Sequence, residues 1–348
     1  MTAVLQAGSP APSAATASAP GTGLAILVNA NAKRGGRRVA AQIASSLPGA
    51  VVRLTRSPKE IDNWLRAWPA PRGVFAAGGD GTAIGLVNAL ARVTPTDAPL
   101  PTMGILPLGT GNAWAHALGA PKLHRCLELL ASTPGVLPIH RSGLVEVEGI
   151  LAHFAGSGWD AMILDDYRRQ VDTTKGPGRR LTKSVLGYLS AALLRTVPKV
   201  VLLGNPRVLV ENLGRDVYTL DPSGRPHRLD AIHGSVLYDG PAGAASVGTC
   251  PEFGYGFRAF PFAERMPGFI SVRIFARGAL GAVASIPRLW RGFHPLRGMH
   301  DWLATDVRMT FSRPVPLQVG GDALGMRRTV EYRASPRALC MVDWRRMG

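Results

Sequence analysis

The stretch "VFAAGGDGTAIGLVNAL", Val74–Leu90, places three glycines around one aspartate, between an apolar run and an amphipathic segment. The apolar run predicts a buried strand, and the residues after Gly81 have helical spacing. Two interpretations of the junction are open. It is either a tight strand-to-helix turn, or a loop whose backbone N–H groups surround phosphate oxygens at the start of a helix.

The same alternation of strand and helix extends from residue 24 to about residue 132. Strands are expected at 24–30, 50–55, 73–79 and 102–109, and helices at 38–47, 58–68, 82–92 and 123–132. This order predicts an α/β layer with a mostly parallel sheet. Ligands usually bind at the carboxyl ends of such strands. Asn29, the Gly78–Thr82 loop and the Gly109–Asn112 loop all fall at that edge.

After about residue 137 short strand-like segments separated by turns predict a β-rich second domain, a sandwich. Helical segments are expected at Gly178–Arg195 and at Leu280–Arg291, the latter broken by Pro287. The Ala/Ser/Pro-rich residues 1–22 predict a disordered tail. The expected domains are therefore 23–137 and 138–348, with the last segment a candidate to return to the first domain.

Composition restricts the class of partner. Forty Lys and Arg against 23 Asp and Glu give a net charge of +17. A chain this basic favours nucleic acid, an acidic membrane surface or phosphate-rich small molecules. No aromatic-basic RNA motif is present, so nucleic acid is not an expected partner. The oligomeric state is left open, with a homodimer as one candidate.

Location is also constrained. The three cysteines are far apart in the sequence and show no zinc spacing, which fits a reducing cytoplasm. The N-terminus has no signal-peptide pattern, and no apolar run is long enough to span a bilayer. We therefore expect a cytoplasmic protein whose membrane contact is peripheral. Gly176–Lys199 and Ile286–Trp302, which combine basic and apolar residues, are candidates for that contact, and packing inside the protein is the alternative for both.

The first glycine loop has the composition of a phosphate site. Gly78, Gly79 and Gly81 carry no side chain that would block close approach, and Thr82 can cap the following helix and offer a hydroxyl. A carboxylate at Asp80 would repel phosphate unless Mg²⁺ lies between them, or unless it holds a water or a substrate hydroxyl. An ordinary Asp-Gly turn is the alternative. The sequence is not a P-loop.

A second loop, in "GILPLGTGNAWAHALG" (Gly104–Gly119), repeats the pattern of a strand, small residues and a helix. Gly109, Thr110 and Asn112 offer amides and short polar groups. Two such loops behind neighbouring strands could hold one nucleotide from two sides.

The order of "ILVNANAKRGGR", "GGDGT", "LPLGTGNAWAHALG", "GSGWDA" and "LQVGGDALG" resembles the diacylglycerol kinase catalytic-domain superfamily of lipid kinases, which includes sphingosine and ceramide kinases. The resemblance covers about residues 24–325. It implies an N-terminal nucleotide-binding domain of the kind shared with NAD kinases and a C-terminal β-sandwich, with the active site in the cleft between them. It also implies transfer of the γ-phosphoryl group of ATP, with Mg²⁺, to the primary hydroxyl of a membrane lipid.

The resemblance assigns roles residue by residue. The nucleotide-binding candidates are Asn29, Gly78, Gly79, Gly81, Thr82, Gly109, Thr110 and Asn112. Asp322 matches the family's general base and, with Asp80, is a candidate catalytic residue. Asp80 is also the candidate metal contact, through water. Asp160 matches an acid near the lipid head group.

Four positions depart from the family pattern. Ala30 replaces a proline, Ala113 and His116 replace an acid and an arginine, and Gly320 replaces the first acid of the late motif. The "GNA" form is closer to sphingosine kinases than to bacterial diacylglycerol kinases. Diacylglycerol, ceramide and a sphingoid base therefore all stay open as substrates. Two alternatives to a lipid kinase remain: an NAD kinase-like enzyme, and a catalytically weak regulator that binds lipid or nucleotide.

Overall fold

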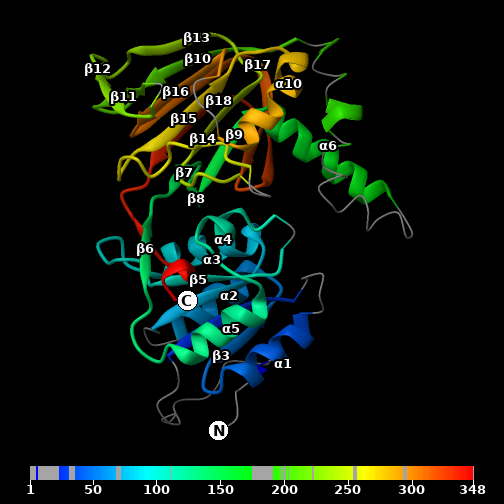
Figure 1. Ribbon diagram of the computed structural model, residues 1–348, viewed down its shortest axis with the longest axis vertical. Helices are drawn as coiled ribbons and strands as arrows, with labels where there is room; N and C mark the ends of the chain where they lie inside the picture. Colours follow the sequence, from blue (N-terminus) through cyan, green and yellow to red (C-terminus); the bar gives the residue numbers. More distant parts are fainter. Residues whose placement is uncertain are drawn as a thin grey trace. The chain divides into compact units, whose positions relative to one another are not determined.

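The computed structural model describes residues 5–6, 23–30, 36–67, 72–109, 111–174, 190, 192–196, 198, 201–202, 204–221, 223–253, 257–292 and 296–347. The chain divides into two compact units (Figure 1). The first comprises Met1–Ser142 together with Arg337–Gly348, and the second comprises Gly143–Pro336. Of the predicted tail, the described part is Leu5–Gln6, a two-residue strand; the remainder lies outside the described residues.

A seven-stranded sheet forms the centre of the first unit. Its order is β1 (Leu5–Gln6), β3 (Val51–Thr55), β2 (Leu24–Asn29), β4 (Gly73–Gly78), β5 (Met103–Pro107), β19 (Leu339–Val342), β6 (Ile139–Ser142). Neighbouring strands are parallel from β1 to β19, and β6 is antiparallel to β19. All six residues of β4 are buried, as are the five apolar residues of β2, because helices cover both faces of the sheet.

The helices of the first unit are α1 (Gly36–Ser46), α2 (Pro58–Ala67), α3 (Asp80–Val93), α4 (Ala113–Ala117) and α5 (Leu123–Ser132). α1 packs on α5, and α2 packs on α3. The connection through α1 leads from β2 to β3 on one side of it. The connection through α2 leads from β3 back past β2 to β4 on the other side. Right-handed crossovers in opposite directions place α1 and α2 on opposite faces of the sheet. The predicted strands and helices of this part of the chain are confirmed.

The second unit is built on a twelve-stranded antiparallel sheet. The main path is β12 (Pro226–Leu229), β11 (Val217–Leu220), β16 (Met299–Ala304), β15 (Ile270–Phe275), β14 (Ala244–Gly248), β9 (Phe154–Gly158), β17 (Asp306–Val319), β18 (Asp322–Ala334), β7 (Val145–Val147), β8 (Ile150–Ala152). A side arm of β10 (Arg207–Asn212) and β13 (Val236–Pro241) leaves β17. The predicted fold class, an α/β domain followed by a β-rich domain, is confirmed.

The side arm packs onto the main path through aromatic rings. Tyr238 of β13 lies 4.8 Å from the ring of His300 and 6.4 Å from the ring of Trp302, both on β16. These strands are not hydrogen-bonded neighbours in the described sheet, so the rings join two layers, as in a sandwich. Arg273 of β15 and Asp301 of β16 form a bidentate ion pair of 2.6 and 3.1 Å, with side chains 6% and 1% exposed.

Two helices of the second unit bear on the sequence predictions. α10 (Ala279–Trp290) contains Pro287 and continues past it, so the predicted break is wrong. Most of the predicted Gly178–Arg195 helix lies outside the described residues, which include a π-helical turn at Ala192–Thr196. α6 (Trp159–Thr173) directly follows β9. Among the described residues, no helix has the length and apolar character needed to cross a bilayer.

Candidate functional site

The carboxyl ends of β2 and β4 mark the point where the strand order of the first sheet reverses. β2 has β3 on one side and β4 on the other, and the chain crosses from β3 to β4 through α2. Open α/β sheets bind ligands in the crevice at such a switch point. Asn29 ends β2 and Gly78 ends β4, so the first two candidate segments lie at this point.

The first loop is a direct strand-to-helix junction. Gly79 is the N-cap of α3, and its carbonyl accepts the N–H groups of Thr82 (2.9 Å) and Ala83 (3.1 Å). The N–H groups of Asp80 and Gly81 belong to the first turn, where amides have no acceptor inside the helix and the helix dipole is positive. This first turn can therefore receive an anion.

Thr82 has a different structural role from the predicted one. α3 begins at Asp80, two residues earlier than expected, so Thr82 is inside the helix and does not cap it. Its hydroxyl instead accepts a hydrogen bond from Nδ2 of Asn29 (3.2 Å). A Cβ on Gly78 would lie 2.2 Å from that hydroxyl oxygen, so only glycine fits at the end of β4. Asn29, Gly78 and Thr82 thus form one contact between β2 and α3.

The second loop lies directly on the first. The amide of Leu108 donates to the carbonyl of Gly78 (2.9 Å). A Cβ on Gly79 would be 3.1 Å from the Cα of Gly109, and a Cβ on Gly109 would be 2.5 Å from the Cα of Gly79. The backbones of Gly79 and Gly109 are therefore in direct contact. A side chain at either position would push them apart, which explains glycine at both.

Asp80 joins the two loops through its carboxylate. Oδ2 accepts the N–H of Ala113 (3.0 Å), and Oδ1 accepts the N–H of Trp114 (3.1 Å). These are the first two amides of α4, so Asp80 caps that helix from another segment of the chain. Hydrogen bonds to a charged acceptor contribute about 1.5–3 kcal/mol each. Sequence reasoning singled out Asp80 but did not identify this partner.

Asn112 completes the turn into α4. It has a left-handed backbone, with φ 50° and ψ 41°, and its Nδ2 donates to the carbonyl of Gly109 (2.9 Å). Its Oδ1 is buried and has no hydrogen-bond partner among the described residues. Thr110 lies outside the described residues. Ala113 is one of the positions that depart from the family pattern. Its backbone N–H bonds to Asp80, and its methyl group is fully buried.

Metal-ligating side chains do not gather in the part of the chain that the structure describes, where no group of three or more His, Cys, Asp or Glu lies together. The metal contact assigned to Asp80 stays a prediction.

The two candidates in the second unit lie on separate elements. Asp322 is exposed at the tip of the β17–β18 hairpin, paired with Val319 across a two-residue turn. Gly320 and Gly321 in that turn both have positive φ (55° and 87°), as a type I′ turn requires. Asp160 is the second residue of α6, and its side chain is outside the described set. The catalytic role of Asp322 and the lipid contact of Asp160 stay predictions, as does the cleft.

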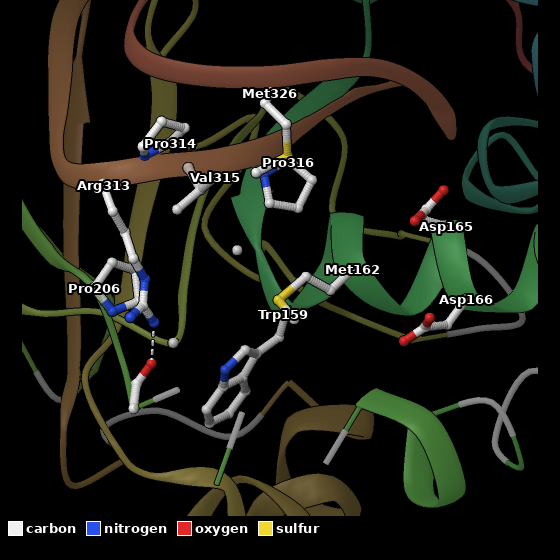
Figure 2. Close-up of a pocket in the computed structure, with 13 residues that line it drawn as sticks. Trp159, Met162, Asp165, Asp166, Pro206, Arg313, Pro314, Val315, Pro316 and Met326 are labelled. Atoms are coloured by element: carbon white, nitrogen blue, oxygen red, sulfur yellow. Dashed lines mark hydrogen bonds between the residues drawn. The ribbon is translucent and has the colours of Figure 1, made fainter. Parts of the chain in front are cut away.

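Sequence reasoning missed a cavity of about 220 Å³ inside the second unit (Figure 2). Its walls are mainly apolar and include Trp159 and Met162 of α6, Val315 and Pro316 of β17, and Met326 of β18. Arg313 lies on one side of the view and the carboxylates of Asp165 and Asp166 on the other. The sequence motif "GSGW" indicated Asp160, the acid after it, as a site residue. In the structure Trp159 of that motif faces the cavity.

Polar groups also border this cavity. The guanidinium of Arg313 donates to the carbonyl of Gly204. The indole Nε1 of Trp159 is buried and has no hydrogen-bond partner among the described residues. Asp166 is 2% exposed and accepts a hydrogen bond from Thr196 (2.9 Å). The cavity is thus apolar in its walls and polar at its ends.

Known proteins similar to this chain support the sequence resemblance. The family model of the diacylglycerol kinase catalytic domain matches residues 23–134. A 49-residue stretch is 51% identical to the diacylglycerol kinase of Bacillus subtilis strain 168, covering 14% of this chain and 15% of that protein. A 73-residue stretch is 44% identical to the eye-specific diacylglycerol kinase of Drosophila melanogaster, covering 21% of this chain and 5% of that protein. The matches thus span a small part of these relatives.

Solved structures extend the likeness to the whole fold. The crystal structure of a diacylglycerol kinase from Bacillus anthracis strain Sterne has a TM-score of 0.60 at 14% identity, covering 95% of this chain and 100% of that chain. A further structure from the same strain has a TM-score of 0.65 at 15% identity, with the same coverage. At this identity the likeness shows the fold alone. The resemblance to the diacylglycerol kinase catalytic-domain superfamily is confirmed.

Proposed function

We propose that this chain is an ATP-dependent lipid kinase, which transfers the γ-phosphoryl group of ATP to the primary hydroxyl of diacylglycerol, ceramide or a sphingoid base. One observation carries the proposal: two glycine loops meet backbone to backbone at the switch point of the first sheet, joined by the carboxylate of Asp80. The family match of residues 23–134 supports the same activity.

The residues at the loops suit a triphosphate. The first-turn amides of α3 supply donors, and the absence of a Cβ at Gly79 and Gly109 leaves backbone rather than side chains at the surface of the loops. The buried Oδ1 of Asn112, which has no hydrogen-bond partner in the described part of the chain, offers an acceptor for a polar group of the nucleotide. In this proposal Asn29 and Thr82 hold the shape of the site through their mutual hydrogen bond.

Mg²⁺ would neutralise the charge that develops on the phosphate oxygens. Both oxygens of Asp80 already accept amide hydrogen bonds, so a metal contact through water suits this carboxylate better than direct ligation. Phosphate oxygens and water would supply the remaining ligands, as is usual for Mg²⁺. The residues present therefore fit a metal held mainly by the nucleotide.

The acceptor side of the reaction rests on the second unit. Asp322 is exposed at a hairpin tip, where it can accept the proton of the lipid hydroxyl, a role that contributes on the order of 10²–10⁴-fold. The cavity beside Trp159 offers apolar walls for part of the lipid. Asp160, at the first turn of α6, is the proposed head-group contact.

Peripheral attachment to an anionic membrane is part of the proposal. Leu194, Val201 and Leu202 are 75%, 62% and 85% exposed, and Met326 of the cavity wall is 56% exposed. Exposed apolar side chains of this size, on a chain with a net charge of +17, suit the interface of an acidic bilayer.

A labelled-phosphate assay tests the proposal. The purified chain is incubated with γ-labelled ATP and Mg²⁺, and diacylglycerol, ceramide and sphingosine are offered in parallel in mixed micelles, with NAD in a separate reaction. The expected result is label on at least one lipid, lost in Asp80→Ala. Label on NAD alone would identify the NAD kinase alternative. ATP binding without any transfer would identify the regulator, and either result would overturn the lipid kinase.

A further inference from the structure

The last residues of the chain are built into the first unit. β19 lies between β5 and β6, with Met341 opposite Met103 of β5. The guanidinium of Arg337 donates to carbonyl groups of Ala91 (3.1 Å) and Ala98 (3.2 Å), at and beyond the end of α3. The pairing of β19 and the hydrogen bonds of Arg337 therefore fix the chain in place just before the residues that contact the end of α4.

Trp344 contacts the supports of both glycine loops. It is 2% exposed, its backbone N–H donates to the carbonyl of Leu118 (3.1 Å), and its ring lies edge-on to the ring of Phe75, with 6.2 Å between centroids. Leu118 directly follows α4. Phe75 is in β4, three residues before Gly78. The ring of Trp344 therefore packs against the strand of the first loop, and its backbone N–H bonds to the residue that follows the helix of the second.

The neighbours of Trp344 make this contact rigid. The carboxylate of Asp343 accepts the N–H (3.2 Å) and the Nε (2.9 Å) of Arg345, which closes a 3₁₀ turn at Trp344–Arg346. Gly119 has a φ of 72°, and a Cβ there would lie 2.3 Å from Cγ of Arg345. The chain just after α4 is therefore in close contact with this turn.

A five-residue helix cannot maintain itself, because helices shorter than about 12 residues are marginal in water. α4 is held at its first turn by the carboxylate of Asp80 and at its last turn by the backbone N–H of Trp344, whose ring fixes that backbone against Phe75 of β4. We propose that Trp344 is a positioning residue for the nucleotide site, which holds α4 and the Gly109–Asn112 loop against β4. The inference rests on the proposed function only in naming ATP as the ligand.

Three variants separate positioning from bulk stability. Trp344→Ala removes the ring, whereas Trp344→Phe keeps an aromatic contact with Phe75 and loses no hydrogen bond, since the indole Nε1 has no partner among the described residues. Arg346→Ala, an exposed change in the same turn, is the matched control. If the alanine variant does not fold, Trp344→Leu keeps an apolar side chain there and takes its place.

The readouts are hydrogen exchange of the 109–118 segment, ATP affinity by equilibrium dialysis, and KM for ATP and for the lipid. Trp344→Ala is expected to speed exchange in that segment and to weaken ATP binding at least tenfold. KM for the lipid should stay within twofold, and Trp344→Phe should approach wild type. Unchanged ATP affinity, or an equal loss for ATP and lipid that phenylalanine does not rescue, would overturn the inference. Hydrogen exchange and dialysis give a result even if no lipid is phosphorylated. A failure of the proposed function can therefore be distinguished from a failure of this inference.

Discussion

Removing the carboxylate of Asp80 should release α4 from the first glycine loop. Asp80→Ala deletes two hydrogen bonds, of 3.0 and 3.1 Å, from a charged acceptor to the amides of Ala113 and Trp114. At about 1.5–3 kcal/mol each the sum is roughly 3–6 kcal/mol, and because the site is only partly buried we expect the lower end, about 3 kcal/mol. Asp80→Asn keeps one acceptor oxygen and should lose about half as much.

Hydrogen exchange measures this loss at the bonds themselves. A decrease of about 3 kcal/mol in opening free energy corresponds to roughly 100-fold faster exchange of the amides at the start of α4. Asp62→Ala is the matched control, because Asp62 is an acid of the same unit whose partner, Arg92, lies on the surface of α3. That variant should leave α4 unchanged. If the amides of Ala113 and Trp114 exchange at the wild-type rate in Asp80→Ala, the carboxylate of Asp80 does not hold α4.

Three further substitutions and one labelling experiment test other parts of the structure. Gly109→Ala should abolish ATP binding measured by equilibrium dialysis, because its Cβ would lie 2.5 Å from the Cα of Gly79, whereas Gly135→Ala, where no atom lies within 4 Å, should bind normally. Asp322→Asn should lower kcat on the lipid by about 10²–10⁴-fold with ATP affinity unchanged. Asp216, an acid paired with Arg228 on the surface of the same unit, is the control, and Asp216→Asn should leave kcat unchanged. Loss of ATP binding in Asp322→Asn would contradict the assignment. Asp301→Ala should destabilise the second unit to urea by about 3–5 kcal/mol, since it leaves Arg273 buried without its carboxylate, and a loss below 1 kcal/mol would contradict the burial of this pair. Burial raises the pKa of the Cys126 thiol to about 12, so at pH 8 only about one thiol in 10⁴ is ionised, and mass spectrometry should find Cys126 unlabelled by maleimide until the chain is unfolded.

The α/β order of the first unit could be predicted because its signals are local. β4 is an uninterrupted apolar run that ends in glycine, and α2 begins with proline and an acid, so periodicity and end signals agree. Local signals also placed the second loop, because Gly109 and Asn112 come between a strand and a helix start.

Contacts between distant segments could not be predicted in the same way. Asp80 was identified, but its partners are 33 and 34 residues away, and no pattern around Asp80 indicates them. The start of α3 was misplaced because a threonine is a common cap, while here Gly79 takes that position. Trp344 was not predicted at all, since its importance depends on where β19 enters the sheet.

Equilibrium dialysis of the full chain with labelled ATP and Mg²⁺, in wild type and in Gly79→Val, tests most directly whether the two glycine loops bind the nucleotide. Wild type should bind one ATP per chain and the variant none, because a side chain at residue 79 would force the two loops apart. Equal ATP binding by both proteins, or no binding by wild type, would contradict it.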